Sequence, residues 1–136
     1  MRSKADLLRE CTTIAVVGLS PRPDRPSHEV ASYLKGKGYR IIPVNPAVEE
    51  VLGEKSYPDL LSIPERVDMV DVFRRSEEVM PFVEGAIKIG ASCIWMQDGV
   101  INEAAAARAR EAGLDVVMND CTARQHRRLT AEGALK

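Results

Sequence analysis

The chain of 136 residues contains 45% hydrophobic and 29% charged residues, a balance typical of a soluble globular domain and not of a disordered chain. Its 19 basic and 20 acidic residues leave a formal net charge of −1, which excludes a global basic footprint for nucleic acid. We therefore expect one domain spanning residues 1–136, without a nucleic-acid partner.

The cysteines and the N-terminus indicate the compartment. Cys11, Cys93 and Cys121 form an odd, widely spaced set with no C-x-x-C pair, so neither a disulfide framework nor a zinc site is expected. The first residues carry scattered charges and no apolar region of the kind that a signal peptide needs. Apolar runs fall far short of the roughly 20 residues of a membrane span. The sequence predicts a cytoplasmic protein without a membrane partner.

Short apolar runs alternate with amphipathic stretches along the chain. The runs predict buried strands at residues 14–17, 40–44, 67–73, 93–96 and 115–118. The amphipathic stretches predict helices at residues 4–10, 27–37, 81–89, 102–112 and 122–131. This alternation is typical of an α/β protein with a doubly wound, mainly parallel five-stranded sheet and helices on both faces, in three layers.

One segment departs from the alternation. Residues 46–64 contain Pro46, Gly53, Pro58 and Pro64, which interrupt any long helix. We expect a loop with a short helical turn there in place of a full crossover helix.

The segment after the first predicted strand is the strongest candidate binding element, because ligands of doubly wound sheets lie beyond the carboxyl ends of the strands. Gly18 ends the strand and lets a ligand approach the backbone, and Ser20 offers a hydroxyl. Ser27 is expected to cap the next helix, whose N-terminus favours anions. Arg22 and Arg25 add donors suited to phosphate. The alternative is a proline-stiffened surface loop with solvated arginines.

The segment after the second predicted strand bears on the type of nucleotide. The first loop lacks both the G-x-G-x-x-G pattern and the P-loop pattern. A dinucleotide site also expects an acidic residue near the end of the second strand, where this chain has Asn45 and Pro46. An uncharged residue there tolerates a phosphate on the ribose, which a carboxylate would repel.

Arg74 and Arg75 follow the third predicted strand and form a second basic pair at the same edge. They are suited to an anionic ligand, since guanidinium groups pair well with phosphate. The alternative interpretation is a solvated loop, or an ion pair with Glu77 or Glu78.

Three further residues follow the last two strands. Gln97 and Gly99 can line a channel for an uncharged ligand arm, or form a plain turn. Cys121 lies near the start of the last helix, where the helix dipole can lower the pKa of a thiol. The alternative for Cys121 is a buried structural cysteine.

The ordered set of motifs resembles the CoA-binding domain family, the domain that also begins the succinyl-CoA synthetase alpha subunit. The resemblance starts with Gly18-x-Ser20-x-x-Pro23-x-x-x-Ser27-x-x-Val30. It continues through Val44-Asn45-Pro46, Val72-Phe73-Arg74, Trp95-Met96-Gln97-x-Gly99 and Cys121. It covers about residues 10–130, and the likeness is closest to small stand-alone bacterial and archaeal proteins.

The resemblance implies a Rossmann-like fold that holds CoA across the strand ends. It implies that the phosphates face Gly18, Ser20, Arg25 and Ser27. It implies that the adenosine lies near Asn45 and Pro46, with Phe73 and Arg74 at the next strand end. It implies that the pantetheine side lies nearer Gln97, Gly99 and Cys121. Before the cysteine, the stand-alone proteins tend to show Asp followed by a basic residue, whereas this chain has Asn119 and Asp120.

The expected function is binding of coenzyme A or an acyl-CoA without independent catalysis. In the synthetase the phosphorylated histidine belongs to a separate domain, and these 136 residues are expected to hold no counterpart. One alternative is an enzyme that uses NAD(P) or an acyl-CoA, and another is a protein-interaction module that retains the fold. The neutral Asn45 argues against NAD, and the lack of a paired nucleophile and base argues against acyl chemistry. The sequence identifies no protein partner.

Overall fold

The five predicted strands form one parallel sheet. The structure is a computed structural model, and it describes residues 1–135. Its main strands are β1 (Thr13–Val17), β2 (Arg40–Val44), β5 (Met69–Val72), β6 (Cys93–Met96) and β7 (Asp115–Val117). They follow the order β2-β1-β5-β6-β7, and every neighbouring pair is parallel. The strand prediction is confirmed, although β5 is shorter than the predicted 67–73.

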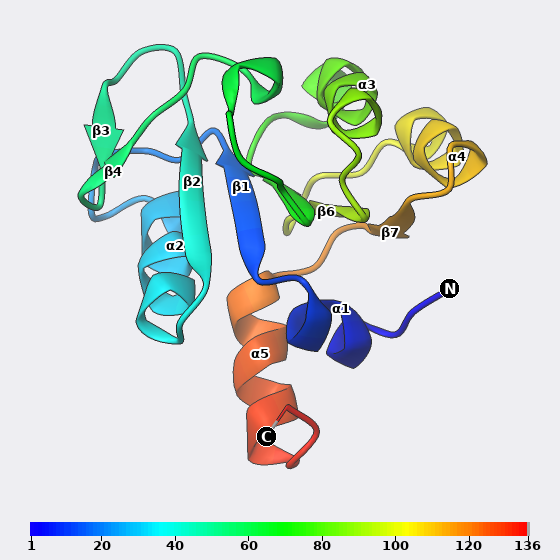
Figure 1. The fold of residues 1–136 in the computed structure, drawn as a ribbon. Coiled ribbons are helices and arrows are strands. Elements are labelled where there is room, and N and C mark those ends of the chain that lie inside the picture. The colour runs from blue at the N-terminus through cyan, green and yellow to red at the C-terminus, as the bar shows by residue number, and fades with distance from the viewer. Residues whose placement is uncertain (136) are drawn as a thin grey trace.

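Helices cover both faces of this sheet (Figure 1). They are α1 (Lys4–Glu10), α2 (Pro26–Gly36), α3 (Met80–Lys88), α4 (Glu103–Glu111) and α5 (Thr122–Ala131). The buried side chains of α3 and α4 pack with one face of the sheet, and those of α1, α2 and α5 pack with the other. The three-layer, Rossmann-like α/β prediction is confirmed.

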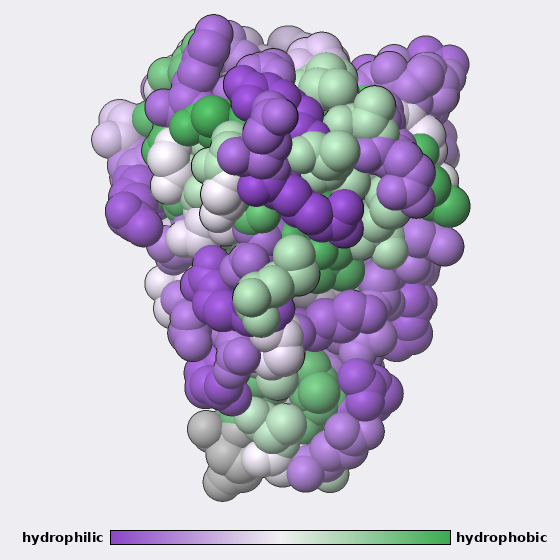
Figure 2. All heavy atoms as spheres, turned by 90° about the vertical axis from the view of Figure 1, so that its right-hand side faces the viewer, coloured by the Kyte–Doolittle hydropathy of each residue, from purple (hydrophilic) through white to green (hydrophobic). Residues whose placement is uncertain are grey.

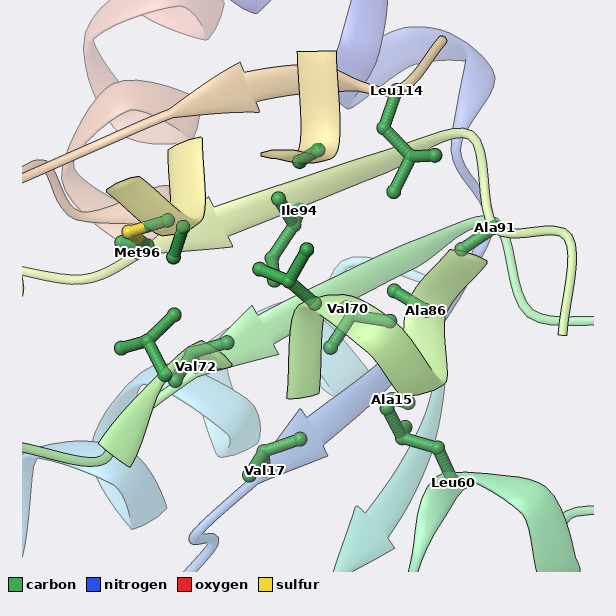
Figure 3. Packing of buried hydrophobic residues seen from close by; sticks show 14 of the residues in the cluster. Ala15, Val17, Leu60, Val70, Val72, Ala86, Ala91, Ile94, Met96 and Leu114 are labelled. Atoms are coloured by element: carbon green, nitrogen blue, oxygen red, sulfur yellow. The ribbon is translucent and has the colours of Figure 1, made fainter. Parts of the chain in front are cut away.

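Alternate residues of each strand supply the two cores, because successive side chains of a strand point to opposite faces. Val70 on β5 and Ile94 on β6 lie in the core beside α3, together with Ala86 of that helix (Figure 3). Met69 and Trp95, which belong to the same two strands, lie in the opposite core. Burial on both faces explains why the strands appear in the sequence as nearly continuous apolar runs.

The outer surface is more polar. Hydrophilic side chains cover much of the face that includes α4 and the edge strand β7, with smaller hydrophobic areas between them (Figure 2). Within residues 1–135, no helix is both long and apolar enough to cross a membrane.

The connection between β2 and β5 holds a small ribbon that the sequence analysis missed. The antiparallel strands β3 (Glu50–Val51) and β4 (Glu54–Lys55) are joined at Leu52 and Gly53, whose φ angles are 55° and 75°. Two consecutive positive φ angles define the hairpin turn that suits the twist of paired strands, although a leucine seldom occupies it. The expected short helical turn is present as η1 (Leu60–Ser62).

Candidate functional site

The order of the strands sets the position of the site. From β1 the chain winds outward to β2, and from β5 it winds in the opposite direction to β6 and β7. The reversal lies between β1 and β5, and ligands of such sheets bind at this point, beyond the carboxyl ends of the strands. The arrowheads of β1 and β2 mark that edge at the top of Figure 1.

A cavity of about 680 Å³ lies at this point. Every predicted site residue that follows β1, β5 or β6 lines it. The lining residues are Gly18, Ser20, Arg22, Arg25, Pro26, Ser27, Phe73, Arg74, Arg75, Glu78, Gln97, Asp98, Gly99 and Val100. The carboxyl ends of parallel strands share one edge of a sheet, so residues far apart in sequence meet there.

The loop between β1 and α2 differs from the expectation in one respect. The structure places Arg25 at the N-cap and Pro26 in the first turn, so Ser27 is not the N-cap that the sequence analysis predicted. Proline is favoured at the first helical position because its missing N–H needs no partner there. The buried Ser27 hydroxyl instead accepts a hydrogen bond from the Ser20 backbone N–H at 3.0 Å. This bond holds the loop against the start of the helix.

Two of the four arginines of the cavity share one carboxylate. Glu78 Oε1 lies 3.1 Å from Arg74 Nε, and Glu78 Oε2 lies 2.9 Å from Arg75 Nη2. The hydrogen bond from Arg75 lowers the pKa of Glu78, and Arg74 adds to this effect. The sequence analysis gave an ion pair with Glu77 or Glu78 as part of the alternative interpretation of Arg74 and Arg75. The ion pair with Glu78 is present in the structure.

The other two arginines lie on the first loop. Arg22 Nη2 lies 3.3 Å from Asp24 Oδ2, and both side chains are more than half exposed, so this ion pair adds little stability. Arg25 forms no ion pair with any residue in 1–135. Arg25, which lines the cavity, therefore has no carboxylate partner among these residues that a ligand would have to displace.

The structure gives a reason for the glycine at position 18 that sequence reasoning did not identify. Its φ of 84° is in the left-handed region, and a Cβ built on it would overlap the Phe73 carbonyl oxygen. The missing side chain therefore lets the end of β1 pack against the end of β5, whatever a ligand requires.

The turn after β6 is fastened by two residues that sequence reasoning missed. Asn119 Oδ1 accepts a hydrogen bond from the Gly99 N–H at 2.7 Å, and Ser76 Oγ accepts one from the Ile101 N–H at 2.9 Å. Ser76 and Asn119 follow β5 and β7, so their positions after strands were the available signal.

A buried polar cluster lies beneath the cavity. Gln97, 3% exposed, donates from Nε2 to Asp71 Oδ1 at 2.7 Å and to Thr122 Oγ1 at 2.9 Å. Burial raises the pKa of Asp71 to about 7, and the hydrogen bonds from Gln97 and Thr122 limit the rise. Asp71 interrupts an apolar run, which was its sequence signal, but the sequence analysis gave it no role.

Three predicted residues lie elsewhere. Asn45 and Pro46 line a separate hollow of about 460 Å³ beside β4, and Asn45 Nδ2 donates to the Leu19 carbonyl oxygen at 3.0 Å. Cys121 is the N-cap residue of α5, is partly buried, and is not among the residues that line the main cavity. The structure thus brings together the residues after β1, β5 and β6, but not those after β2 and β7.

Comparison with known proteins agrees with this architecture. The sheet order and the two helical layers define a Rossmann-like α/β fold, and a solved structure of a hypothetical protein from Pyrococcus horikoshii shares it. That structure matches with a TM-score of 0.91 and 43% identity, over 95% of this chain and 93% of its own.

Sequence comparison gives the family. Residues 12–127 match the model of the CoA binding domain, so the chain belongs to the CoA-binding domain family. Uncharacterized protein YneT of Bacillus subtilis is 43% identical over 116 residues, which are 85% of this chain and 86% of that protein. ADP-forming acetate–CoA ligase II of Archaeoglobus fulgidus is 39% identical over 59 residues, which are 42% of this chain and 9% of the ligase.

Proposed function

We propose that the protein binds coenzyme A or an acyl-CoA in the cavity between the ends of β1, β5 and β6. The observation that carries the proposal is the position of four arginines, Arg22, Arg25, Arg74 and Arg75, around one cavity at the reversal point of the sheet. Guanidinium groups bind phosphate oxygens through paired hydrogen bonds, and CoA carries three phosphates. Membership of the CoA-binding domain family supports the same ligand.

The neutral end of β2 favours CoA over NAD. Asn45 stands where a dinucleotide site expects a carboxylate for the ribose hydroxyls, and its side-chain amide donates to the Leu19 carbonyl oxygen. Asn45 lines the separate hollow beside β4, and a neutral group there does not repel the ribose phosphate that distinguishes CoA from dephospho-CoA, as a carboxylate would.

We also propose that the described residues do not catalyse acyl transfer by themselves. Catalysis by Cys121 would need a base beside its thiol. His126, the histidine of the same helix, is buried, and its Nδ1 is hydrogen-bonded to the Tyr33 hydroxyl at 2.7 Å. Turnover of acetyl-CoA or succinyl-CoA with a nucleotide, abolished by a substitution in the cavity, would contradict this part of the proposal.

Calorimetric titration of the purified protein with CoA, dephospho-CoA, NAD and ATP tests the binding. One charge-assisted hydrogen bond contributes about 1.5–3 kcal/mol, so CoA should bind roughly 10- to 150-fold more tightly than dephospho-CoA. NAD should be weaker still, because it lacks both the ribose phosphate and the pantetheine arm. Equal affinities for CoA, dephospho-CoA and NAD would refute the phosphate argument and favour the interaction-module alternative.

The matched variants are Arg25→Ala and Arg110→Ala. Arg25 lines the cavity, whereas Arg110 is exposed in the last turn of α4. Arg25→Ala should weaken CoA binding, and Arg110→Ala should leave it unchanged. An equal effect of both variants would indicate a nonspecific charge effect. Such an effect should weaken strongly as salt is added, because dissolved ions screen exposed charges that are far apart.

A further inference from the structure

The orientation of the Gln97 side-chain amide is decided by two buried partners. Thr122 has a single hydroxyl hydrogen, and it points to Asp71 Oδ2 at 3.2 Å. The hydroxyl can therefore only accept from Gln97, and the ionised Asp71 carboxylate can only accept as well. Both amide hydrogens of Gln97 are needed to satisfy these two acceptors, at 2.7 Å and 2.9 Å.

The reverse orientation is strongly disfavoured. It would set the Gln97 carbonyl oxygen against two acceptor oxygens in a site where Asp71 and Thr122 are fully buried. Lone pairs facing one another without a hydrogen leave buried polar groups unsatisfied, which is costly. While Asp71 is ionised, the amide nitrogen of Gln97 is therefore fixed inward and its carbonyl oxygen outward.

The outward oxygen reaches the cavity. Among the described residues, no buried side-chain nitrogen or oxygen lacks a hydrogen-bond partner. Gln97 Oε1 takes part in none of the hydrogen bonds that fix this side chain, so it must reach accessible surface, and the surface that Gln97 lines is the cavity. The floor of the cavity thus presents one oriented acceptor.

We propose that Asp71 and Thr122 act as positioning residues that hold Gln97 Oε1 as a fixed acceptor, which selects ligand arms that carry an N–H donor. The inference rests on the proposed function, because the arm of CoA that carries N–H donors is its pantetheine amide chain. A ligand with an ester oxygen in place of the N–H would set two acceptors against each other.

Two single-ester analogues of CoA, each with one pantetheine amide N–H replaced by an ester oxygen, test the selection. Titrations are carried out at pH 8, where Asp71, with a pKa of about 7, is mainly ionised. We expect one analogue to bind the native protein about tenfold more weakly than CoA. 3′-Phosphoadenosine diphosphate, which lacks the arm, serves as the reference ligand for the rest of the site.

Three substitutions test whether Gln97 and its two partners cause the difference in affinity between CoA and the ester analogue. The quantity compared is the affinity for CoA divided by the affinity for the more weakly bound ester analogue. Gln97→Met keeps the volume but removes the acceptor, so this ratio should fall to about one. Asp71→Asn offers Gln97 both an acceptor and a donor, so both amide orientations become possible and the ratio should fall several-fold. Thr122→Val keeps the shape, removes one acceptor and should lower the ratio less, because the Asp71 acceptor remains. Gln125→Met on α5, outside the cavity, should keep the full ratio.

The outcomes separate this inference from the proposed function. If CoA and 3′-phosphoadenosine diphosphate both fail to bind, the proposed function is wrong and the inference falls with it. If CoA binds and both ester analogues bind as tightly as CoA, the inference alone is wrong. The same holds if the affinity ratio persists in Gln97→Met. Unchanged affinity for 3′-phosphoadenosine diphosphate shows that each variant is folded. Should Gln97→Met fail this check, the ratios of Asp71→Asn and Thr122→Val decide.

Discussion

The carbonyl oxygen of Phe73 occupies the space into which a side chain on Gly18 would extend. These residues follow β1 and β5, the two strands between which the sheet reverses its winding direction. The glycine therefore sets how closely the two strand ends approach, and with it the shape of the cavity that both residues line.

Gly18→Ala should destabilise the protein more than Gly99→Ala. Both glycines have φ angles near 80°, so each alanine incurs the left-handed penalty of about 1–2 kcal/mol. Only the alanine at position 18 also overlaps a backbone atom, since nothing lies within 4 Å of a Cβ at position 99. We expect an additional loss of about 1–3 kcal/mol in the free energy of unfolding, measured by urea denaturation. Equal losses would show that the Phe73 contact relaxes without cost.

Ser27→Ala should lower the free energy of unfolding by about 1 kcal/mol, because the Ser20 N–H loses its hydrogen-bond acceptor. The control is Ser32→Ala, an exposed serine on the same helix. Both variants gain the helix propensity of alanine, so their difference isolates the hydrogen bond. Thermal and urea unfolding measure it, and equal stability of the two variants would assign no energetic role to the Ser20–Ser27 bond.

Glu78→Gln should strengthen the binding of CoA by about two- to fivefold, because a ligand phosphate no longer competes with this carboxylate for Arg74 and Arg75. Glu77→Gln is the control, since its closest approach to Arg75 is 3.8 Å and its side chain is 70% exposed. Calorimetry at low salt gives the affinities. Weaker binding by Glu78→Gln would mean that the carboxylate itself holds the ligand or the loop.

Asp71→Asn should change how stability depends on pH. Burial raises the pKa of Asp71 to about 7 in the folded state, against about 3.9 in the unfolded chain, so the folded state holds this proton more strongly. The stabilising contribution is complete below about pH 4 and is lost as the pH rises to about 7. The native protein should therefore lose stability relative to Asp71→Asn across this range, and the difference should level off above about pH 8.

Urea unfolding at a series of pH values measures this difference. Cys93 on β6 interacts electrostatically with Asp71, but its hydrogen bond with Cys11 and its burial raise its pKa, so it stays protonated over this range. Asp68→Asn is the control. Burial opposes ionisation of Asp68, but the N–H groups of Thr13 and Thr12, together with Arg66, outweigh it and lower its pKa. Its contribution should be flat between about pH 5 and pH 8. A flat difference for Asp71→Asn as well would contradict a raised pKa for Asp71.

The sequence predicted most of the fold because its signals are local. Strands buried on both faces need apolar side chains at every position, so β1 and β6 appear as continuous apolar runs. The cap of α4 was also predictable, since Asn102 accepts from the Ala105 N–H within its own first turn. The β3–β4 ribbon was not predicted, because Leu52 adopts a positive φ that is uncommon for a leucine.

The sequence by itself determined which strand ends carry candidate site residues, because each follows an apolar run. Only the tertiary structure decided which of those ends share the cavity, since the order of strands depends on packing between distant segments. It also decided which residues hold the Gln97 side chain, since its partners Asp71 and Thr122 lie 26 and 25 residues away on β5 and α5. Hydrogen bonds between buried side chains on three elements leave no periodic pattern in the chain, so they become visible only once these elements are packed.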